Sequence, residues 1–315
     1  MDLSIFFAGT AGSVPTPRRG LPAILLRAGG ERILLDCGEG TQHQLLRSSV
    51  GLPDVDAIFI THLHLDHWLG LPGMIKTFDM RDRDRKLELF GPPGLNALFR
   101  QVLRPIIGRT GYPLEVVELE QHEEVGFEDF VIAAFPVNHR VEAYGYAFVE
   151  DDRPGRFDVE AARKLGVTEG PDFGRLQRGE TVNGITPEQV VGEDRPGRRI
   201  VYTGDTAPVQ SVEVYAHKAD VLIHEATFCE DERGRARETG HSTARQAAQT
   251  AKDAKVKLLA LTHLSTRYFP REIREEAKAI FENTVVPRDF DTIEVPFPER
   301  GEPHLVKPEL VEASS

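Results

Sequence analysis

Short aliphatic runs that end on histidine or acidic residues are the feature that most constrains how this chain of 315 residues can fold. The runs lack polar alternation, so each is typical of a strand buried on both faces. They are residues 57–61 before His62, 130–135 ahead of His139, 200–204 before Asp205, 221–223 before His224 and Glu225, and 258–262 before His263. Polar groups at strand ends gather along one rim of a sheet, where active sites of layered α/β folds lie. We therefore expect these side chains to converge.

Helical patterns lie between the runs. Residues 93–103 and 270–281 carry apolar positions at three- and four-residue spacing, each with an early proline suited to a helix start. Ser242 is the predicted N-cap of an alanine-rich helix that follows it. Helices interspersed with strands predict a layered α/β sandwich.

One segment interrupts the strand sequence. Residues 150–181 are rich in Gly, Pro and Arg, and they predict an inserted flexible arm within a single domain that spans residues 1–315. A loop with no role is the alternative for this segment. Residues 297–315 are rich in proline and acidic residues, so we expect a loosely held C-terminal tail.

Charge gives a mixed indication about partners. The 50 acidic and 38 basic residues leave a net charge of −12, which argues mildly against nucleic acid. Local basic clusters such as Arg18 with Arg19 can still contact phosphate, although solvated surface charge is the simpler reading of each cluster alone.

The cysteines and the N-terminus indicate a cellular compartment. Cys37 and Cys229 are the only cysteines, which fits a reducing environment without disulfides. We find no signal peptide and no apolar stretch of membrane-spanning length. The sequence therefore predicts a cytoplasmic protein that does not insert into a membrane.

Residues 62–67, His-Leu-His-Leu-Asp-His, are the strongest chemical signal in the chain. In an extended segment alternate residues share a face, so His62, His64 and Asp66 point together while His67 turns away with the chain. Imidazole nitrogens and carboxylate oxygens are ligands that zinc accepts. A surface histidine cluster without metal is the alternative, and the other strand-end residues count against it.

The candidate ligands are too many for one tetrahedral zinc ion and suit two. We assign one ion to His62, His64 and His139. The second ion receives Asp66, His67 and His263, and the carboxylate of Asp205 bridges the pair. Two ions a few ångström apart can hold a hydroxide between them and clamp a phosphoryl group for in-line attack.

These motifs resemble the metallo-β-lactamase superfamily, which implies a four-layer αββα sandwich with a protruding exosite arm. Further motifs resemble the short form of the ribonuclease Z family, the tRNA 3′-processing endoribonucleases. They are residues 34–42 (LLDCGEGTQ), 224–227 (HEAT), 240–243 (GHST) and 263–268 (HLSTRY). The resemblance runs from residue 1 to about residue 285 and includes the insertion.

The resemblance implies a zinc-dependent endoribonuclease that removes 3′ trailers from precursor tRNA, leaving a 3′-hydroxyl on the tRNA and a 5′-phosphate on the trailer. It implies two Zn²⁺ per subunit, which Mn²⁺ or Fe²⁺ can replace, and a homodimer. Asp66 would assist proton removal from the attacking water, and His241 would protonate the leaving 3′ oxygen. Glu225 would orient and charge His241.

The same resemblance implies the RNA contacts. The arm of the family grips the tRNA elbow, and the basic residues that fit this role here are Lys164, Arg175 and Arg178. The N-terminal basic segment, with Arg18 and Arg19, and the final motif, with Ser265 and Arg267, are the other expected contacts. Gly20 stands where the family frequently has Asn, which is a departure in that loop.

Several polar residues near these motifs have supporting roles in this interpretation. We expect Asp36 and Cys37 to support the site from behind and His224 to be buried beside it without binding metal. Two other functions stay open: a thioester or cyclic-nucleotide phosphodiester hydrolase of the same fold, and a non-catalytic metal-binding protein. The last of these has no need for His241.

Overall fold

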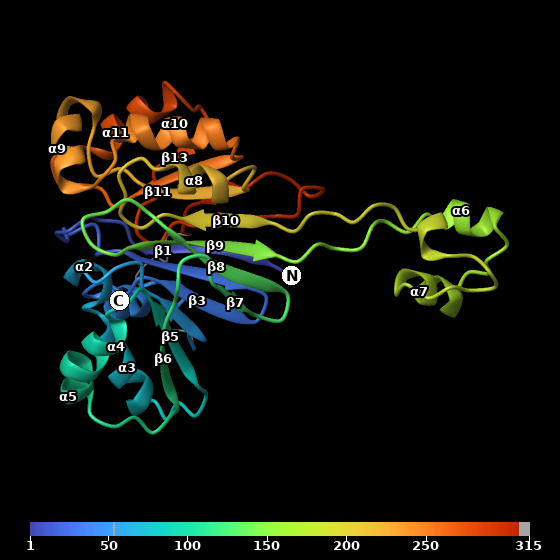
Figure 1. Ribbon diagram of the computed structural model, residues 1–315, viewed down its shortest axis with the longest axis horizontal. Helices are drawn as coiled ribbons and strands as arrows, with labels where there is room; N and C mark the ends of the chain where they lie inside the picture. Colours follow the sequence, from blue (N-terminus) through green and yellow to red (C-terminus); the bar gives the residue numbers. More distant parts are fainter. Residues whose placement is uncertain (53, 309–315) are drawn as a thin grey trace, which may run out of the picture.

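Two mixed β-sheets pack face to face in the computed structural model, which describes residues 1–52 and 54–308. Helices cover the outer face of each sheet (Figure 1). The arrangement is the four-layer αββα sandwich of the metallo-β-lactamase fold, so the predicted fold class is confirmed.

The first sheet has eight strands. In spatial order they are β15 (His304–Val306), β14 (Thr292–Glu294), β1 (Leu3–Gly9), β2 (Ala23–Ala28), β3 (Glu31–Leu35), β4 (Ala57–Phe59), β5 (Leu87–Gly91) and β6 (Leu114–Glu118). Strands β3 to β6 run parallel, and the other neighbours pair antiparallel.

The second sheet has seven strands. Their spatial order is β13 (Thr284–Val285), β12 (Leu258–Thr262), β11 (Val221–Glu225), β10 (Arg199–Tyr202), β9 (Tyr144–Glu150), β8 (Phe130–Pro136) and β7 (Glu124–Gly126). Strands β10 to β13 run parallel. All five sequence runs form strands, but β4 lies in the first sheet and the other four in the second. The polar strand ends therefore meet along one rim of a two-sheet sandwich and not of a single sheet.

Both faces of the strands are buried, as their apolar composition predicts. Along β1, Ile5 and Phe7 point into the core between the sheets, whereas Phe6 and Ala8 point toward the helices outside. Residues in the second sheet alternate in the same way between the central core and an outer core. The sandwich thus has three apolar layers that hold its rims in a fixed arrangement.

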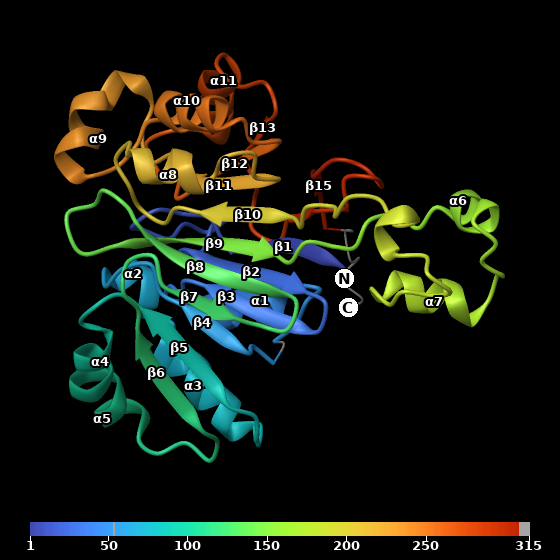
Figure 2. The same ribbon diagram turned by 45° about the vertical axis from the view of Figure 1, so that its right-hand side comes forward.

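Helices of two groups complete the layers (Figure 2). The first sheet is covered by α1 (Thr41–Arg47), α2 (Leu65–Trp68), α3 (Leu71–Met80), α4 (Leu95–Leu98), the π-helical turn Phe99–Leu103 and α5 (Arg104–Ile107). The second is covered by α8 (Gln210–Tyr215), α10 (Ala244–Ala254) and α11 (Pro270–Lys278), and α9 (Arg233–Thr239) lies beside this layer. The remaining 3₁₀ turns are Pro187–Gln189 and Glu230–Glu232. In the described residues no helix has the length and apolar character needed to cross a membrane.

The start of α10 differs from the prediction. Thr243, not Ser242, is the N-cap: its hydroxyl accepts from the backbone N–H of Gln246, and the Gln246 side chain accepts from the N–H of Thr243. The hydroxyl of Ser242 donates instead to the carbonyl of Thr206, 2.6 Å away. The helix expected at 93–103 begins two residues later than expected and continues through a π-helical turn to Ile107.

A long segment between β9 and β10 projects far from the sandwich (Figure 1). It carries α6 (Val159–Lys164) and α7 (Pro171–Gln177), which enclose a small apolar cluster of their own centred on Ala162 and Leu176. The projection continues to residue 198, so it is longer than the 150–181 expected from composition. Asp158 caps α6 by accepting from the N–H of Ala161.

The C-terminal segment is held more closely than expected. Residues 304–306 form β15 and pair with β14, and Phe297 and Glu299 contact arginines at the base of the projection. The expected loose tail is therefore wrong for residues 297–308, because backbone pairing and arginine contacts hold them. Residues 309–315 lie outside the described residues.

Candidate metal centre

The first group of donor atoms forms where the chain leaves β4 and β8. The ligand atoms of His62, His64 and His139 all lie within 4.8 Å of one another. His62 Nε2 is 2.9 Å from His64 Nδ1, which is 3.2 Å from His139 Nε2. The other ring nitrogen of His139 lies 2.8 Å from the carbonyl oxygen of Gly240, to which it can donate. That contact leaves Nε2 free to act as a ligand.

A second group lies beside the first. Asp66 and His67 lie on α2. His263 follows β12 directly, in a left-handed backbone conformation with φ of 57°. Asp66 Oδ2 is 3.6 Å from His67 Nε2 and 3.5 Å from His263 Nε2. Thr227 Oγ1 lies 2.9 Å from His263 Nδ1, on the far side of the ring.

Asp205 lies between the two groups at the end of β10. Its Oδ2 is 3.8 Å from His62 Nε2 and 3.5 Å from His67 Nε2, and its Oδ1 is 3.2 Å from His263 Nε2. Burial alone would raise the pKa of this carboxyl group, but the imidazoles of His263 and His67 hold it well below its usual range. Asp205 is therefore a carboxylate placed where a bridging ligand would be.

Unpartnered polar atoms test whether this cluster fits a metal. His67 Nε2, His263 Nε2 and Asp205 Oδ1 are buried and have no hydrogen-bond partner in the described part of the chain. A buried polar atom without a partner costs about 1–3 kcal/mol. A cation between these atoms would remove that cost, and a set of imidazole and carboxylate donors is one that divalent metals accept. The residues fit a divalent metal centre.

Asp36 supports the cluster from behind, as expected. It is fully buried, and its carboxylate accepts from the N–H of Thr61 at 2.8 Å and from the hydroxyl of Tyr202 at 2.8 Å. The same carboxylate lies 2.8 Å from Nδ1 of His67, and this contact directs Nε2 of His67 into the cluster. Cys37 is buried, and burial raises the pKa of its thiol to about 12, so it is no nucleophile.

His241 and Glu225 form a hydrogen-bonded pair at the edge of the cluster. His241 Nδ1 is 2.8 Å from Glu225 Oε1 and 3.8 Å from Asp205 Oδ2. Glu225 is fully buried and accepts from the N–H groups of Thr206 and Thr227. Burial lowers the pKa of His241, but the Glu225 carboxylate outweighs it and the net effect raises this pKa to about 9. The Glu225 carboxylate thus favours the protonated form of the imidazole.

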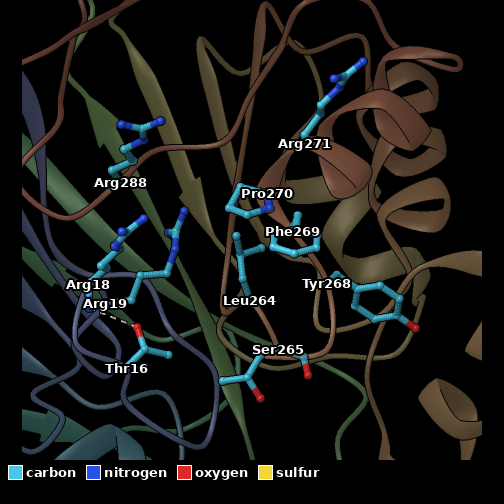
Figure 3. Close-up of a pocket in the computed structure, with 11 residues that line it drawn as sticks. Thr16, Arg18, Arg19, Leu264, Ser265, Tyr268, Phe269, Pro270, Arg271 and Arg288 are labelled. Carbon is cyan, nitrogen blue, oxygen red and sulfur yellow. Dashed lines mark hydrogen bonds between the residues drawn. The ribbon is translucent and has the colours of Figure 1, made fainter.

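Next to His263 a cavity of about 630 Å³ brings together basic and aromatic side chains. Figure 3 shows Arg18, Arg19 and Arg288 on one side of it and Phe269, which is 77% exposed, on the other. Ser265 also lines this cavity. Two of the predicted RNA-contact segments thus meet here.

Arg267 differs from Ser265, since it does not line the cavity. Its guanidinium lies 3.4 Å from the carboxylate of Glu232. The basic residues of the arm lie far from the cluster, on or next to α6 and α7: Lys164 is exposed, and Arg175 and Arg178 both pair with Glu180. Their charge is partly neutralised within the arm.

Asp36 was predicted, but other residues that hold these groups in place could not be recognised in the sequence. Tyr202 donates to Asp36, and Asp289 accepts from Thr10 and from the N–H of Gly20, which fixes the loop that carries Arg19. Neither belongs to a motif, and only the tertiary pairing of distant segments reveals them. His224 is buried, its Nδ1 lies 2.8 Å from the carbonyl oxygen of Glu225, and it stands outside both ligand groups, as expected.

Comparison with known proteins agrees with this geometry. A family model described as beta-lactamase superfamily domain matches residues 174–264, and one described as anti-Pycsar protein Apyc1 matches residues 3–154. The solved structure of human tRNase Z, short form, is 29% identical with a TM-score of 0.68, covering 93% of this chain and 99% of that one. The metallo-beta-lactamase fold protein YhfI from Bacillus subtilis shares the fold, with 20% identity and a TM-score of 0.70. The match covers 94% of this chain and 100% of that one.

Curated relatives are closer in sequence. Ribonuclease Z of Archaeoglobus fulgidus is 44% identical over 95% of this chain and 100% of its own length. Ribonuclease Z of Haloferax volcanii is 45% identical over 94% of this chain and 96% of its own length. Ribonuclease Z of Myxococcus xanthus is 43% identical over 93% of this chain and 98% of its own length. Identity of this degree over nearly the full length of each protein means that the chain belongs to the ribonuclease Z family.

Proposed function

We propose that this protein is a metal-dependent endoribonuclease that removes 3′ trailers from precursor tRNA, leaving a 3′-hydroxyl on the tRNA and a 5′-phosphate on the trailer. The observation that carries the proposal is the meeting of two donor groups, the Asp205 carboxylate and the His241–Glu225 pair at one rim of the sandwich. The full-length relatives named ribonuclease Z support this choice of substrate.

The proposed metal assignment follows the donor groups. His62, His64 and His139 would hold one Zn²⁺, and Asp66, His67 and His263 would hold a second. Asp205 would bridge them, and Mn²⁺ or Fe²⁺ could replace zinc because the donors are nitrogen and oxygen. When bound, the ions supply an activated hydroxide and neutralise charge on the phosphoryl group.

Protein side chains handle the two protons of the reaction. Asp66 would take the proton of the attacking water, and the N–H of Ser13 donates to Asp66 Oδ2 at 3.0 Å and helps to hold it. His241, charged through Glu225, would donate its proton to the 3′ oxygen as the bond to phosphorus breaks. Before this transfer the carboxylate of Glu225 balances the charge of the imidazolium, and throughout it keeps the ring oriented.

The RNA would lie across the cavity beside His263 and reach the arm. Arg18, Arg19 and Ser265 line that cavity, and Arg267 lies at the surface nearby. Lys164, Arg175 and Arg178 would contact the tRNA elbow. Phosphates are bound mainly by such basic groups.

A homodimer is part of the proposal. The arm leaves the body at Glu150, whereas Tyr144, at the other end of β9, donates its N–H to Thr61 beside the cluster. About 20 Å of strand separate these points. In Figure 1 the arm lies at one side and α2, which carries Asp66, at the other. This separation supports an arm that serves the site of a second subunit. The two free, buried cysteines support a cytoplasmic location.

The test is to incubate the purified protein with a 3′-extended precursor tRNA and to map the cut relative to the discriminator base. We expect cleavage at the 3′ side of that base. His241→Ala should reduce the rate by about 10²–10⁴-fold, the usual contribution of a general acid. His217→Ala, the same change at an exposed position away from the cluster, should have no effect.

The two other candidate functions give different results in this test. Hydrolysis of a thioester or a cyclic nucleotide without cleavage of precursor tRNA would contradict the proposal. Metal binding with no hydrolysis, unchanged by His241→Ala, would indicate a metal-binding protein.

A further inference from the structure

The base of the arm is a narrow two-stranded ribbon. Residues 151–158 run outward from β9 and residues 190–198 return to β10. Arg153 and Arg195 pair across the ribbon, and the N–H of each lies 2.8 Å from the carbonyl oxygen of the other. An isolated two-stranded ribbon is at best marginally stable in water. The ribbon therefore needs another contact to keep a fixed direction.

Residues 295–300, which we call the clasp, provide that contact through Glu299. Its carboxylate accepts from Arg153 Nη1 at 2.9 Å and from Arg195 Nη1 at 2.8 Å. Because Arg153 lies on the outgoing strand and Arg195 on the returning strand, one carboxylate ties the two strands together. The three side chains are 19–34% exposed, so water screens these pairs less than fully exposed ones.

Phe297 provides a second contact within the clasp. Its ring contacts two guanidinium groups, with the central carbon of Arg153 3.7 Å and that of Arg198 3.9 Å from the ring centre. Arginine groups over an aromatic face are attracted by the ring quadrupole. One ring therefore joins the outgoing strand of the ribbon, through Arg153, to the point where the returning strand enters the body, at Arg198.

Arg198 fixes the point where the ribbon enters the body. It is only 1% exposed and donates to both carboxylate oxygens of Glu150, at 2.6 and 2.7 Å. It also donates to the carbonyl oxygens of Val295 and Met1, at 2.7 and 2.9 Å. Strands β14 and β15 flank the clasp and anchor it in the first sheet, and Figure 2 shows β15 beside the base of the arm.

We propose that the clasp is a positioning element that holds the arm at a fixed angle to the body, with Phe297 and Glu299 as its working residues. The functional part of this proposal rests on the proposed role of the arm in binding tRNA. An arm released from the clasp would sample many directions, and binding would then have to order it. Release of the arm raises the KM for precursor tRNA and leaves the chemical step unchanged.

The first test measures the position of the arm without any substrate. Spin labels are attached to cysteines introduced at Lys164 on α6 and at Lys252 on α10, both exposed, since the native cysteines are buried. Pulsed dipolar spectroscopy should give a narrow distance distribution for the otherwise wild-type chain. Phe297→Leu and Glu299→Gln should each broaden it, whereas Phe297→Tyr, which keeps the ring, should not.

The second test compares two substrates. Phe297→Leu should raise the KM for a 3′-extended precursor tRNA by roughly tenfold, because the free energy of two cation–π contacts corresponds to about a tenfold change in affinity. Hydrolysis of bis(p-nitrophenyl) phosphate, which is too small to reach the arm, should stay at the wild-type rate. The matched control is Glu282→Gln, which breaks the surface ion pair to Lys278 at the end of α11, away from the arm, and should change neither measurement.

Distinct outcomes separate the two proposals. A distance distribution that stays narrow in both clasp variants overturns the role of the clasp. Parallel losses on the large and the small substrate also overturn it, because they place the damage in the body. If the wild-type protein does not cut precursor tRNA, the proposed function fails, while the distance measurement still decides whether the clasp holds the arm.

Discussion

Replacement of Asp36 by Asn changes one buried atom behind the metal centre and should weaken metal binding strongly. The residue has φ of 58°, a left-handed conformation that Asn tolerates, so the backbone need not move. Asp36 Oδ1 accepts from the N–H of Thr61 and can remain an oxygen in the variant. The amide group then replaces Oδ2, which faces His67 Nδ1 at 2.8 Å and the hydroxyl of Tyr202 at 2.8 Å.

The size of the effect follows from the tautomer of His67. In the wild type Nδ1 donates to the carboxylate and Nε2, which is buried without a partner, is available to a metal ion. An amide N–H opposite Nδ1 favours the other tautomer, in which Nε2 carries the proton and cannot act as a ligand. The Tyr202 hydroxyl can rotate and accept a hydrogen bond from the new amide, so this contact is weakened less than the contact with His67. Losing the hydrogen-bond partner of a metal-binding histidine typically lowers metal affinity by about 10–100-fold.

Chelator competition with zinc would measure this loss, alongside urea unfolding of the metal-free proteins. The matched control is Asp220→Asn, a buried carboxylate that accepts from the N–H of Arg199 and from Lys257 at the end of the strands away from the cluster. We expect both variants to lose about 1–3 kcal/mol of stability, since each weakens buried hydrogen bonds. Only Asp36→Asn should lose zinc affinity. Wild-type zinc affinity in Asp36→Asn would refute the tautomer argument, as would an equal loss in Asp220→Asn.

Three further predictions concern the site and its surroundings. Glu225→Gln removes the carboxylate that raises the pKa of His241 to about 9. If the protonated imidazole is the general acid, the activity of the variant should begin to fall at a lower pH than that of the wild type. Profiles of rate against pH measure this, and an unchanged alkaline limb would argue against His241 as the acid. Thr243→Ala should lower the free energy of unfolding by about 1 kcal/mol through loss of the α10 cap, whereas a wild-type urea midpoint would show that the cap is dispensable. Removal of metal with a chelator should abolish hydrolysis and lower the unfolding temperature. An ion present at 100 times its Kd stabilises the folded protein by about 2.7 kcal/mol. The same unfolding temperature with and without added zinc would speak against a bound metal.

The parts of the fold that follow from local pattern could be predicted, and those that depend on distant pairing could not. The apolar runs show where the main strands lie, because burial on both faces leaves a continuous pattern in the sequence. The distribution of those strands between two sheets is invisible in that pattern. It is decided by pairing across long sequence separations, as between β3 and β4 or between β9 and β10.

The candidate site divides in the same way. His62, His64, Asp66 and His67 form a motif, and strand ends identified the distant candidates. Asp36, which holds His67 in place, was also predicted from its motif, but other supporting residues carry no such signal: Tyr202 looks like any aromatic strand residue. The clasp was missed because proline and acidic residues suggested a loose tail, whereas a strand pairing and three arginines hold that segment.

The arm joins the body at the end of β9 and β10 that lies away from the metal centre, and this placement makes it exchangeable. Antiparallel neighbours such as β9 and β10 can be joined by a hairpin loop of two to five residues, so the sandwich could close without the intervening segment. Insertions, deletions or grafts between Arg153 and Arg195 should leave the geometry of the cutting centre unchanged, because both arginines and every donor residue lie outside that range. With the proposed role of the arm in binding tRNA, arms of different reach would direct the same hydrolytic centre to RNAs of different shape, which makes the projection a starting point for engineering new substrates.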